Sequence, residues 1–169
     1  FAIPANLVAS IVKQAESGAT SFQRPWAGVT GQAMDASLAE SLGLPRPDGV
    51  LVSALHPASP FAAAGLQTGD VILSIGGEPS NTPQEIMFRL ASLGLGASAR
   101  VDWLRDGQAM SADVTLATAP DTPDREALTI TEDVALNGLS VARINPAVMA
   151  EFDLPLDAEG VVVTDAQSL

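Results

Sequence analysis

The stretch that decides the fold of this chain spans residues 64–77 and reads Ala64-Gly65-Leu66-Gln67-Thr68-Gly69-Asp70-Val71-Ile72-Leu73-Ser74-Ile75-Gly76-Gly77. Gly65 stands where a short helix would end, because a glycine there can adopt the left-handed backbone that closes a helix. Gly69-Asp70 predicts a tight turn into a strand at 71–75, whose apolar residues would fill a core. Gly76-Gly77 predicts a two-residue hairpin turn. Together these signals predict a small domain of the α+β class.

The residues on both sides of this stretch predict the other elements. We expect one strand to begin at Gly28-Val29 and further strands to cover 50–52, 100–105 and 108–116. We expect helices at 37–42, from Ser59-Pro60 to Gly65, and from Thr82 to Gly94 or Gly96. Thr82-Pro83-Gln84-Glu85 predicts a capping box, and Asp106-Gly107 predicts a hairpin turn. The apolar residues that alternate along the second hairpin arm predict one buried face: Met110, Ala112, Val114 and Leu116. Trp103, on the first arm, is predicted to lie in the core.

Composition excludes several classes of function. The chain has 169 residues, and 8 Lys and Arg against 20 Asp and Glu give a net charge of -12. An acidic surface repels phosphate, so we expect no nucleic acid among the partners, and we see no run of apolar residues long enough for a membrane span. The absence of cysteine and the single histidine, His56, exclude thiolate chemistry and sites built from several histidines. We predict no cofactor and no metal.

Part of the chain repeats. Glycine, apolar and proline positions recur 110 residues later, so that Gly28, Leu42, Leu44 and Pro45 match Gly138, Phe152, Leu154 and Pro155. After a one-residue insertion, residues 49–53 match residues 160–164 at an offset of 111. The repeat predicts one complete unit followed by the first part of a second. We expect this second part to be partly disordered or docked on the first domain, and we assign no site residues to it.

Residues 64–77 resemble the A-G-L-x-x-G-D-x-I-x-x-I-N-G signature of bacterial PDZ domains, with Gly76 where that pattern has asparagine. The resemblance covers residues 25–117 and implies a PDZ fold, a small and partly open β-barrel of five to six strands with two helices. Residues 24–29 look like the carboxylate-binding loop of the PDZ domains of HtrA/DegP-type serine proteases. Ala27 is smaller than the Leu or Ile usual there, which implies a wider pocket or a weaker affinity.

The front of the chain is similar to the end of a trypsin-like protease domain. Phe1-Ala2-Ile3-Pro4 and the amphipathic pattern that ends at Gly18 look like its last strand and helix. The expected organisation is therefore a protease remnant at 1–18, a linker at 19–24, a first PDZ domain at 25–117, a linker at 118–125 and a truncated second PDZ domain at 126–169.

The resemblance also implies a peptide site. The backbone N–H groups of Ala27, Gly28 and Val29 would bind a terminal carboxylate. Trp26 and Arg24 belong to the same loop, where Trp26 is expected mainly to pack and Arg24 either adds positive charge or is an ordinary solvated side chain. The pocket for the last side chain would be lined by Ala27, Val29, Met87 and Leu90, unless these four are ordinary core residues.

The function implied by the family is recognition of hydrophobic C-termini of misfolded proteins by the PDZ module of an ATP-independent serine endopeptidase of the bacterial periplasm. Binding would regulate proteolysis, with the protease domain of the same protein as a partner. The parent would form a trimer-based homo-oligomer, and this segment could be a monomer. The alternative is an adaptor, chaperone or assembly module whose parent has no active protease domain.

The segment itself is expected to hydrolyse nothing, since it carries no catalytic triad. His56 and Ser59 lie close together in the sequence, but no acid is placed to orient the histidine. We therefore expect a loop histidine and a helix-capping serine. The acidic residues of the hairpin and linker could be a calcium site, but they lack EF-hand spacing and are expected to form a solvated face: Asp102, Asp106, Asp113, Asp121, Asp124 and Glu126.

Overall fold

The computed structural model describes residues 5–16, 22–131 and 138–166. Contacts divide the chain into two compact units, residues 1–118 and residues 119–169, which we describe separately. The strand expected at Phe1–Pro4 and the helix end expected at Gly18 lie outside the described residues. The domain boundaries expected from the sequence stay predictions.

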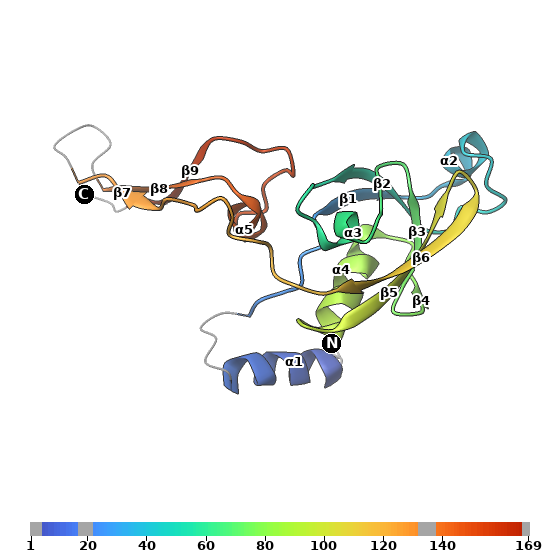
Figure 1. The fold of residues 1–169 in the computed structure, drawn as a ribbon, viewed down its shortest axis with the longest axis horizontal. Helices are drawn as coiled ribbons and strands as arrows, with labels where there is room; N and C mark the ends of the chain where they lie inside the picture. Colours follow the sequence, from blue (N-terminus) through green and yellow to red (C-terminus); the bar gives the residue numbers. More distant parts are fainter. Residues whose placement is uncertain (1–4, 17–21, 132–137, 167–169) are drawn as a thin grey trace. The chain divides into compact units, whose positions relative to one another are not determined.

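The first unit is built on one antiparallel sheet. Its strands are β1 (Val29–Ala33), β2 (Val50–Leu55), β3 (Val71–Ile75), β4 (Glu78–Pro79), β5 (Ser98–Arg105) and β6 (Gln108–Thr115). They lie in the order β1-β2-β3-β5-β6, with β4 paired to β3 off this path (Figure 1). Because β1 and β6 stand at opposite ends of the order and do not pair, the sheet is not closed. The predicted α+β class with an open arrangement of strands is confirmed.

The described residues of the first unit form four helices: α1 (Ala5–Glu16), α2 (Ala36–Ser41), α3 (Pro60–Ala63) and α4 (Pro83–Leu93). The Thr82 hydroxyl accepts from the Glu85 N–H and begins α4, as expected. The Glu85 carboxylate, however, accepts from the N–H of Asn81 rather than that of Thr82, so the reciprocal half of the capping box is displaced by one residue. Helix α1 contacts α4 and exposes Val8, Ile11 and Val12.

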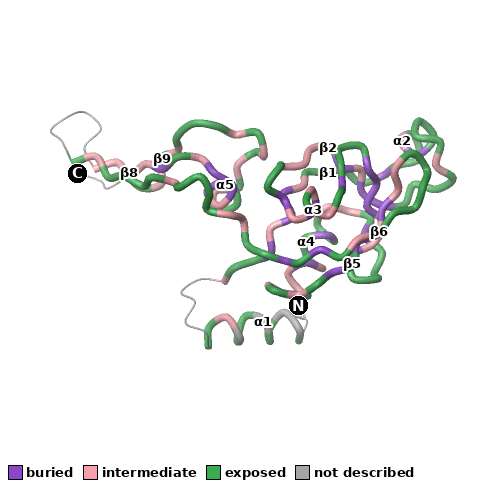
Figure 2. The backbone as a smooth tube through the Cα atoms, viewed as in Figure 1, coloured by how far each residue is buried: buried purple, intermediate pink, exposed green. Residues whose placement is uncertain are grey.

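The core lies between the sheet and helices α3 and α4. Its largest fully buried side chains include Trp103, Phe61, Ile72 and Leu90, and the buried residues are purple in Figure 2. The prediction for Trp103 is confirmed, although its indole N–H has no hydrogen-bond partner among the described residues. The prediction for Met110 is wrong: it is exposed, because it lies near the turn of the β5–β6 hairpin, beyond the cover of the core.

The glycine turns adopt the predicted backbone. Gly76 and Gly77 have φ of 63° and 82° and join Ile75 to its partner Glu78, so the two-residue hairpin is confirmed. Gly65 has φ of 99°, directly after the end of α3. These positive φ angles are ones that glycine adopts without the steric cost of a Cβ.

The second unit is a smaller sheet with one helix. Its strands β7 (Leu128–Thr129), β8 (Leu139–Arg143) and β9 (Val161–Ala166) pair in the order β7-β8-β9, and helix α5 (Pro146–Glu151) connects β8 to β9. Two residues of the predicted linker accept hydrogen bonds near the start of α5: Pro120 from the Ala147 N–H and Asp121 from the Asn145 amide. The expectation that this unit docks on the first domain stays a prediction.

The sequence repeat is also a structural repeat. The β8–β9 pairing copies the β1–β2 pairing at every position, from Val29↔Leu55, which matches Leu139↔Ala166, to Ala33↔Val50, which matches Arg143↔Val161. Both pairings also carry an irregularity at the same place, between Thr30 and Gly31 in one and between Ser140 and Val141 in the other. The first helix of each unit begins at an equivalent capping residue, Asp35 in α2 and Asn145 in α5. The strand pairing and the start of the helix thus repeat in the second unit, while its assignment as a truncated second PDZ domain stays a prediction.

The two copies differ in burial. Val50 is 1% exposed in the first unit, while its counterpart Val161 is 66% exposed. In the first unit β3 pairs with β2 on the edge away from β1, whereas the described residues of the second unit provide no strand at that position beside β9. The second copy therefore repeats the strand pairing of the first, but its β9 is more exposed than β2, while Ala142, Val148 and Met149 are buried.

Candidate functional site

The loop before β1 is held through its carbonyl groups. The Ala27 carbonyl accepts from the hydroxyl of Ser59, and the Gly28 carbonyl accepts from the backbone N–H of His56 at 2.9 Å. The Trp26 N–H donates to the Ala117 carbonyl at 2.8 Å, which attaches the start of the loop to the end of β6. Three separate segments of the first unit thus fix three successive residues.

This arrangement sets the direction of two N–H groups. A trans peptide group is planar, with its C=O and N–H pointing in opposite directions. Because the Ala27 carbonyl points to Ser59, the Gly28 N–H points away from it. In the same way the Val29 N–H points away from His56 and from β2. Within the described part of the chain, no hydrogen-bond acceptor is found for the N–H groups of Ala27 and Gly28.

Strand β1, which follows this loop, also has an edge whose backbone groups are not paired with another described strand. It stands at one end of the sheet order, and among the described residues only β2 pairs with it, so that no described strand lies along its other edge. Helix α4 contacts β1 and is the helix predicted to line the pocket. A strand edge with outward N–H and C=O groups can accept a further extended segment by backbone pairing.

Gly28 cannot be replaced without a shift in this loop. Its φ is +60°, and a Cβ built there would lie 2.8 Å from the Trp26 ring and 2.9 Å from the Ser59 Cβ. The Trp26 ring in turn meets the His56 ring edge-on, with 5.4 Å between the ring centroids. The loop is therefore packed closely against the start of α3.

His56 and Ser59 have structural rather than catalytic surroundings. His56 is half-buried and its Nδ1 accepts from the Ala58 N–H at 3.0 Å, while Ser59 caps α3 through the N–H groups of Phe61 and Ala62. The predicted cap is confirmed. Sequence reasoning missed that Ser59 and His56 both hold the carbonyls of the loop, since no local motif signals a contact across this distance in sequence.

The four residues predicted to line a pocket differ in how far their side chains are exposed to solvent. Ala27 and Leu90 belong to the buried core cluster, Val29 is partly buried against it, and Met87 is 44% exposed on α4. Val29 and Met87 are thus the two of the four whose side chains are not buried. The pocket assignment stays a prediction.

Trp26 and Arg24 occupy different environments in the loop. Trp26 is half-buried, while Arg24 is exposed with its guanidinium 5.9 Å from the centroid of the Phe22 ring. No carboxylate partner of Arg24 is found among the described residues. Its role in binding stays a prediction.

A partly buried ion pair between Arg105 and Asp70 stabilises the stretch at residues 64–77. Arg105 donates to both carboxylate oxygens of Asp70, at 2.8 and 2.7 Å, and also to the Gly65 carbonyl at 2.7 Å. Asp70 is buried and also accepts from the Gln67 N–H. Hydrogen bonding to Asp70 raises the pKa of Arg105. The aspartate of the motif is therefore a structural residue that connects β3, β5 and the end of α3.

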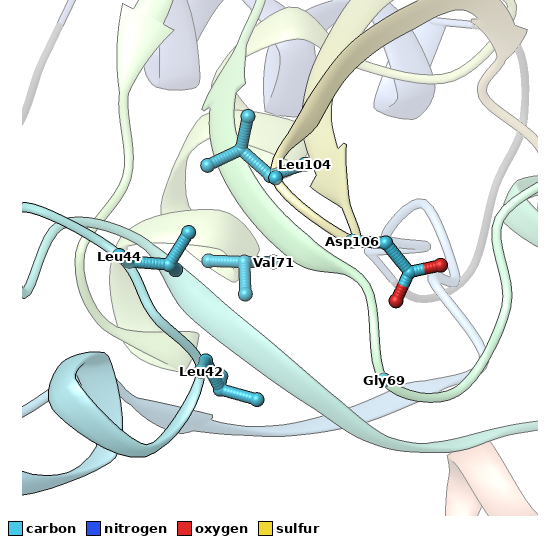
Figure 3. A pocket seen from close by; sticks show the side chains of 7 residues that line it. Leu42, Leu44, Gly69, Val71, Leu104 and Asp106 are labelled. Carbon is cyan, nitrogen blue, oxygen red and sulfur yellow. The ribbon is translucent and has the colours of Figure 1, made fainter.

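A small pocket lies away from β1, near the β5–β6 turn. It measures about 70 Å³ and is lined by Leu42, Leu44, Gly69, Val71, Leu104, Asp106 and Gly107. Figure 3 shows the Leu44 and Val71 side chains facing one another beside it; Val71 belongs to a second, smaller core cluster, and Leu44 packs against that cluster. Asp106 is the charged residue in its lining.

Two of the acidic residues of the hairpin and linker pair with basic or polar side chains. Asp102 accepts from Ser74 and Arg100, and Asp121 accepts from Arg125 and Asn145. Among the described residues there is no group of three or more His, Cys, Asp or Glu side chains that could hold a metal ion. Nor does that part of the chain contain a helix with the length and apolar character needed to cross a bilayer.

The fold and the loop agree with a known family. Residues 28–116 match the family model of the PDZ domain, which covers more than half of the chain. The chain belongs to the PDZ domain family.

Curated relatives of this chain include DegP-like serine endoproteases. A probable periplasmic serine endoprotease, DegP-like, of Pseudomonas fluorescens is 32% identical over 171 residues, covering 99% of this chain and 35% of the relative. Its counterpart in Rhizobium meliloti is 35% identical over 120 residues, covering 71% and 24%. The chain is thus similar to DegP-like serine endoproteases, and it spans about a third or less of their length.

Solved structures similar to this chain include those of an HtrA-type protease. The HtrA-type protease AlgW with a decapeptide superposes with a TM-score of 0.52 at 34% identity, covering 71% of this chain and 37% of that one. The same protease with a tripeptide gives a TM-score of 0.53 at 34% identity, with coverage of 72% and 41%.

Proposed function

We propose that the first unit binds the C-terminal segments of other polypeptides along the free edge of β1. The terminal carboxylate accepts from the N–H groups of Gly28 and Val29, and the preceding residues pair with β1 as an added strand. The preferred ligands are hydrophobic C-termini exposed by misfolded proteins.

The direction of the loop N–H groups is the observation that carries this proposal. Because Ser59 and His56 hold the carbonyls of Ala27 and Gly28, the N–H groups of the same peptide units face the open side. Successive N–H groups that converge on one point form an anion site, and the Gly28 backbone, with φ of +60°, provides the necessary bend. A carboxylate is a small anion that several N–H groups can share.

The rest of the loop supports a selective site. The net charge of -12 repels acidic ligands at long range, so a carboxylate binds only where donors are directed at it. Exposed Arg24 lies in the same loop and adds a positive charge, while Val29 and Met87 offer apolar surface for the last side chain. These features favour a peptide with a hydrophobic end and a free carboxylate.

We further propose that the parent is a periplasmic serine endopeptidase of the HtrA/DegP type. This rests on the relatives, which are named probable periplasmic serine endoproteases, and on the similarity to AlgW, whose structures contain peptides. In such a parent, peptide binding at β1 regulates proteolysis by the protease domain, and subunits assemble into a trimer-based oligomer. This segment recruits substrate and does not cleave it.

The direct test is a titration of the chain followed by the NMR signals of backbone amides. The ligands are a pentapeptide that ends in valine with a free carboxylate and the same peptide with an amidated end. We expect the free acid to shift the Gly28 and Val29 signals and to bind at least about tenfold more tightly, since charge-assisted hydrogen bonds are lost on amidation. Equal affinities, or shifts confined to other strands, would overturn the proposal.

A further inference from the structure

The edge of β8 that corresponds to the free edge of β1 is occupied in the second unit. Strand β7 pairs antiparallel with β8 there, with Leu128 opposite Val141 and Thr129 opposite Ser140. Beyond the strand, the Ile130 N–H donates to the Leu139 carbonyl at 2.9 Å, and the Ile130 carbonyl accepts from the Gly138 N–H at 2.8 Å. Residues 128–130 therefore run along β8 as an added strand.

The edge of β8 that pairs with β7 is equivalent to the free edge of β1. Gly138 is the counterpart of Gly28 and Leu139 of Val29, because β8–β9 and β1–β2 share one register. The Gly28 carbonyl faces β2, so the backbone groups of Val29 face the free edge. The Leu139 carbonyl faces β7 in the same way, since it accepts from Ile130. The N–H of Gly138 thus donates to Ile130 at the place where the Gly28 N–H is proposed to donate to a terminal carboxylate.

We infer that residues 128–130 are an intrachain occupant of the second repeat, with Ile130 in the place of the last residue of a bound peptide. This inference rests on the proposed function of β1, because it identifies the equivalent edge as a peptide site. It has two consequences: the second unit does not offer this edge to an outside peptide while β7 is paired, and Leu128-Thr129-Ile130 is itself a sequence of the kind that β1 accepts.

Backbone pairing holds the occupant, together with the half-buried side chain of Ile130. Leu128 is 61% exposed, so its side chain contributes little apolar contact. The Thr129 and Ser140 hydroxyls lie 2.9 Å apart across the pair and form a hydrogen bond. An edge held mainly by backbone hydrogen bonds and one hydroxyl pair can open locally at modest cost.

The first experiment uses the sequence of the occupant as a probe. The peptide Glu-Ala-Leu-Thr-Ile, which copies residues 126–130 with a free C-terminal carboxylate, is titrated into the full chain beside its amidated form. We expect the free acid to shift the Gly28 and Val29 amide signals and to bind at least about tenfold more tightly than the amide. If the valine peptide binds β1 and this peptide does not, the occupant inference fails while the proposed function stands. If neither binds, the proposed function fails.

The second experiment measures hydrogen exchange of backbone amides in the chain without ligand. We expect the Gly138 amide to exchange at least about tenfold more slowly than the Gly28 amide, because of these two amides only that of Gly138 has an acceptor within the described part of the chain. Ile130→Pro removes the N–H that donates to Leu139 and should release the protection of Gly138. Thr131→Pro is the matched control, since it places a proline next in the chain and leaves the Ile130 N–H in place.

The peptide Glu-Ala-Leu-Thr-Ile also tests whether the edge of β8 becomes available for binding when β7 no longer pairs with it. In the Ile130→Pro chain, added Glu-Ala-Leu-Thr-Ile should slow exchange at Gly138, and in the unaltered chain it should not. An unchanged Gly138 rate in Ile130→Pro would overturn the inference. Exchange at the β9 amides shows whether the second unit of the Ile130→Pro chain stays folded. If that unit unfolds, the binding of Glu-Ala-Leu-Thr-Ile to β1 in the unaltered chain decides the inference.

Discussion

The hydroxyl of Ser59 connects the Ala27 carbonyl to the first turn of α3. It donates to that carbonyl and accepts from the N–H groups of Phe61 and Ala62. Both Ser59 and Ala27 are buried, so these bonds are shielded from water. One side chain therefore begins a helix and sets the orientation of the peptide unit whose N–H belongs to Gly28.

Ser59→Ala should weaken both the fold and the binding of a peptide. The substitution removes a helix cap and leaves a buried carbonyl without its donor, so we expect the free energy of unfolding to fall by about 1–3 kcal/mol. Denaturant unfolding measures this, and the peptide titration measures affinity. Ser53→Ala is the control: Ser53 donates to the Thr30 carbonyl on the exposed side of β2, and its loss should cost less than about 0.5 kcal/mol. Equal effects of the two substitutions would contradict the role given to Ser59.

Gly28→Ala should be more damaging than a glycine substitution at a similar φ elsewhere. The new Cβ at position 28 meets Trp26 and Ser59 at under 3 Å, whereas a Cβ at Gly43, with φ of +66°, has no atom within 4 Å. We expect a loss of about 2–4 kcal/mol for Gly28→Ala and about 1–2 kcal/mol for Gly43→Ala, because only the first adds a clash to the left-handed backbone. Thermal unfolding compares them, and similar losses would show that the loop is not tightly packed.

Asp70→Asn should destabilise the first unit without acting on the loop directly. The amide keeps the shape of the side chain but cannot serve both N–H groups of Arg105 and the Gln67 N–H as a carboxylate does. We expect the unfolding free energy to fall by about 1–3 kcal/mol, the range for a buried polar group that loses its partners. Asp48→Asn, in the exposed pair Arg46–Asp48, should change it by less than about 0.5 kcal/mol. A small effect at Asp70 would show that the pair is dispensable.

Stability should fall in acid partly through Asp102. The Ser74 hydroxyl, and then Arg100, hold the pKa of the Asp102 carboxyl below its ordinary value. Between the lowered pKa of the folded chain and the ordinary pKa of the unfolded chain, the unfolded chain binds more protons, so stability rises with pH across that window. This contribution is complete above the unfolded pKa and is lost as the pH falls through the folded one.

The measurement is the unfolding free energy as a function of pH. We expect Asp102→Asn to have a flatter acid limb than the unaltered chain, and Ser74→Ala to lie between them because it removes the hydrogen bond that lowers the pKa most. An acid limb unchanged by either substitution would exclude this contribution.

Local signals in the sequence predicted most of the backbone. The run from Gly65 to Gly77 predicted a helix end, a buried strand and a two-residue turn, and all three are present because glycine backbone freedom and strand burial are local properties. The repeat between Gly28 and Gly138 also came from the sequence, and the matched register of β1–β2 and β8–β9 confirms it. Met110 was misplaced because alternation predicts which face of a strand a residue occupies but not how far the core extends along it.

The amino-acid sequence by itself determined the fold class, the repeat and the loop before β1 as a region of interest. Only the tertiary structure decided which groups act there. The direction of the Gly28 and Val29 N–H groups depends on Ser59 and His56, which lie about thirty residues away in the chain. The occupation of β8 by residues 128–130 depends on pairing between strands, which no local pattern encodes. Burial and hydrogen-bond partners arise when distant segments meet, and for that reason they had to be read from the folded chain.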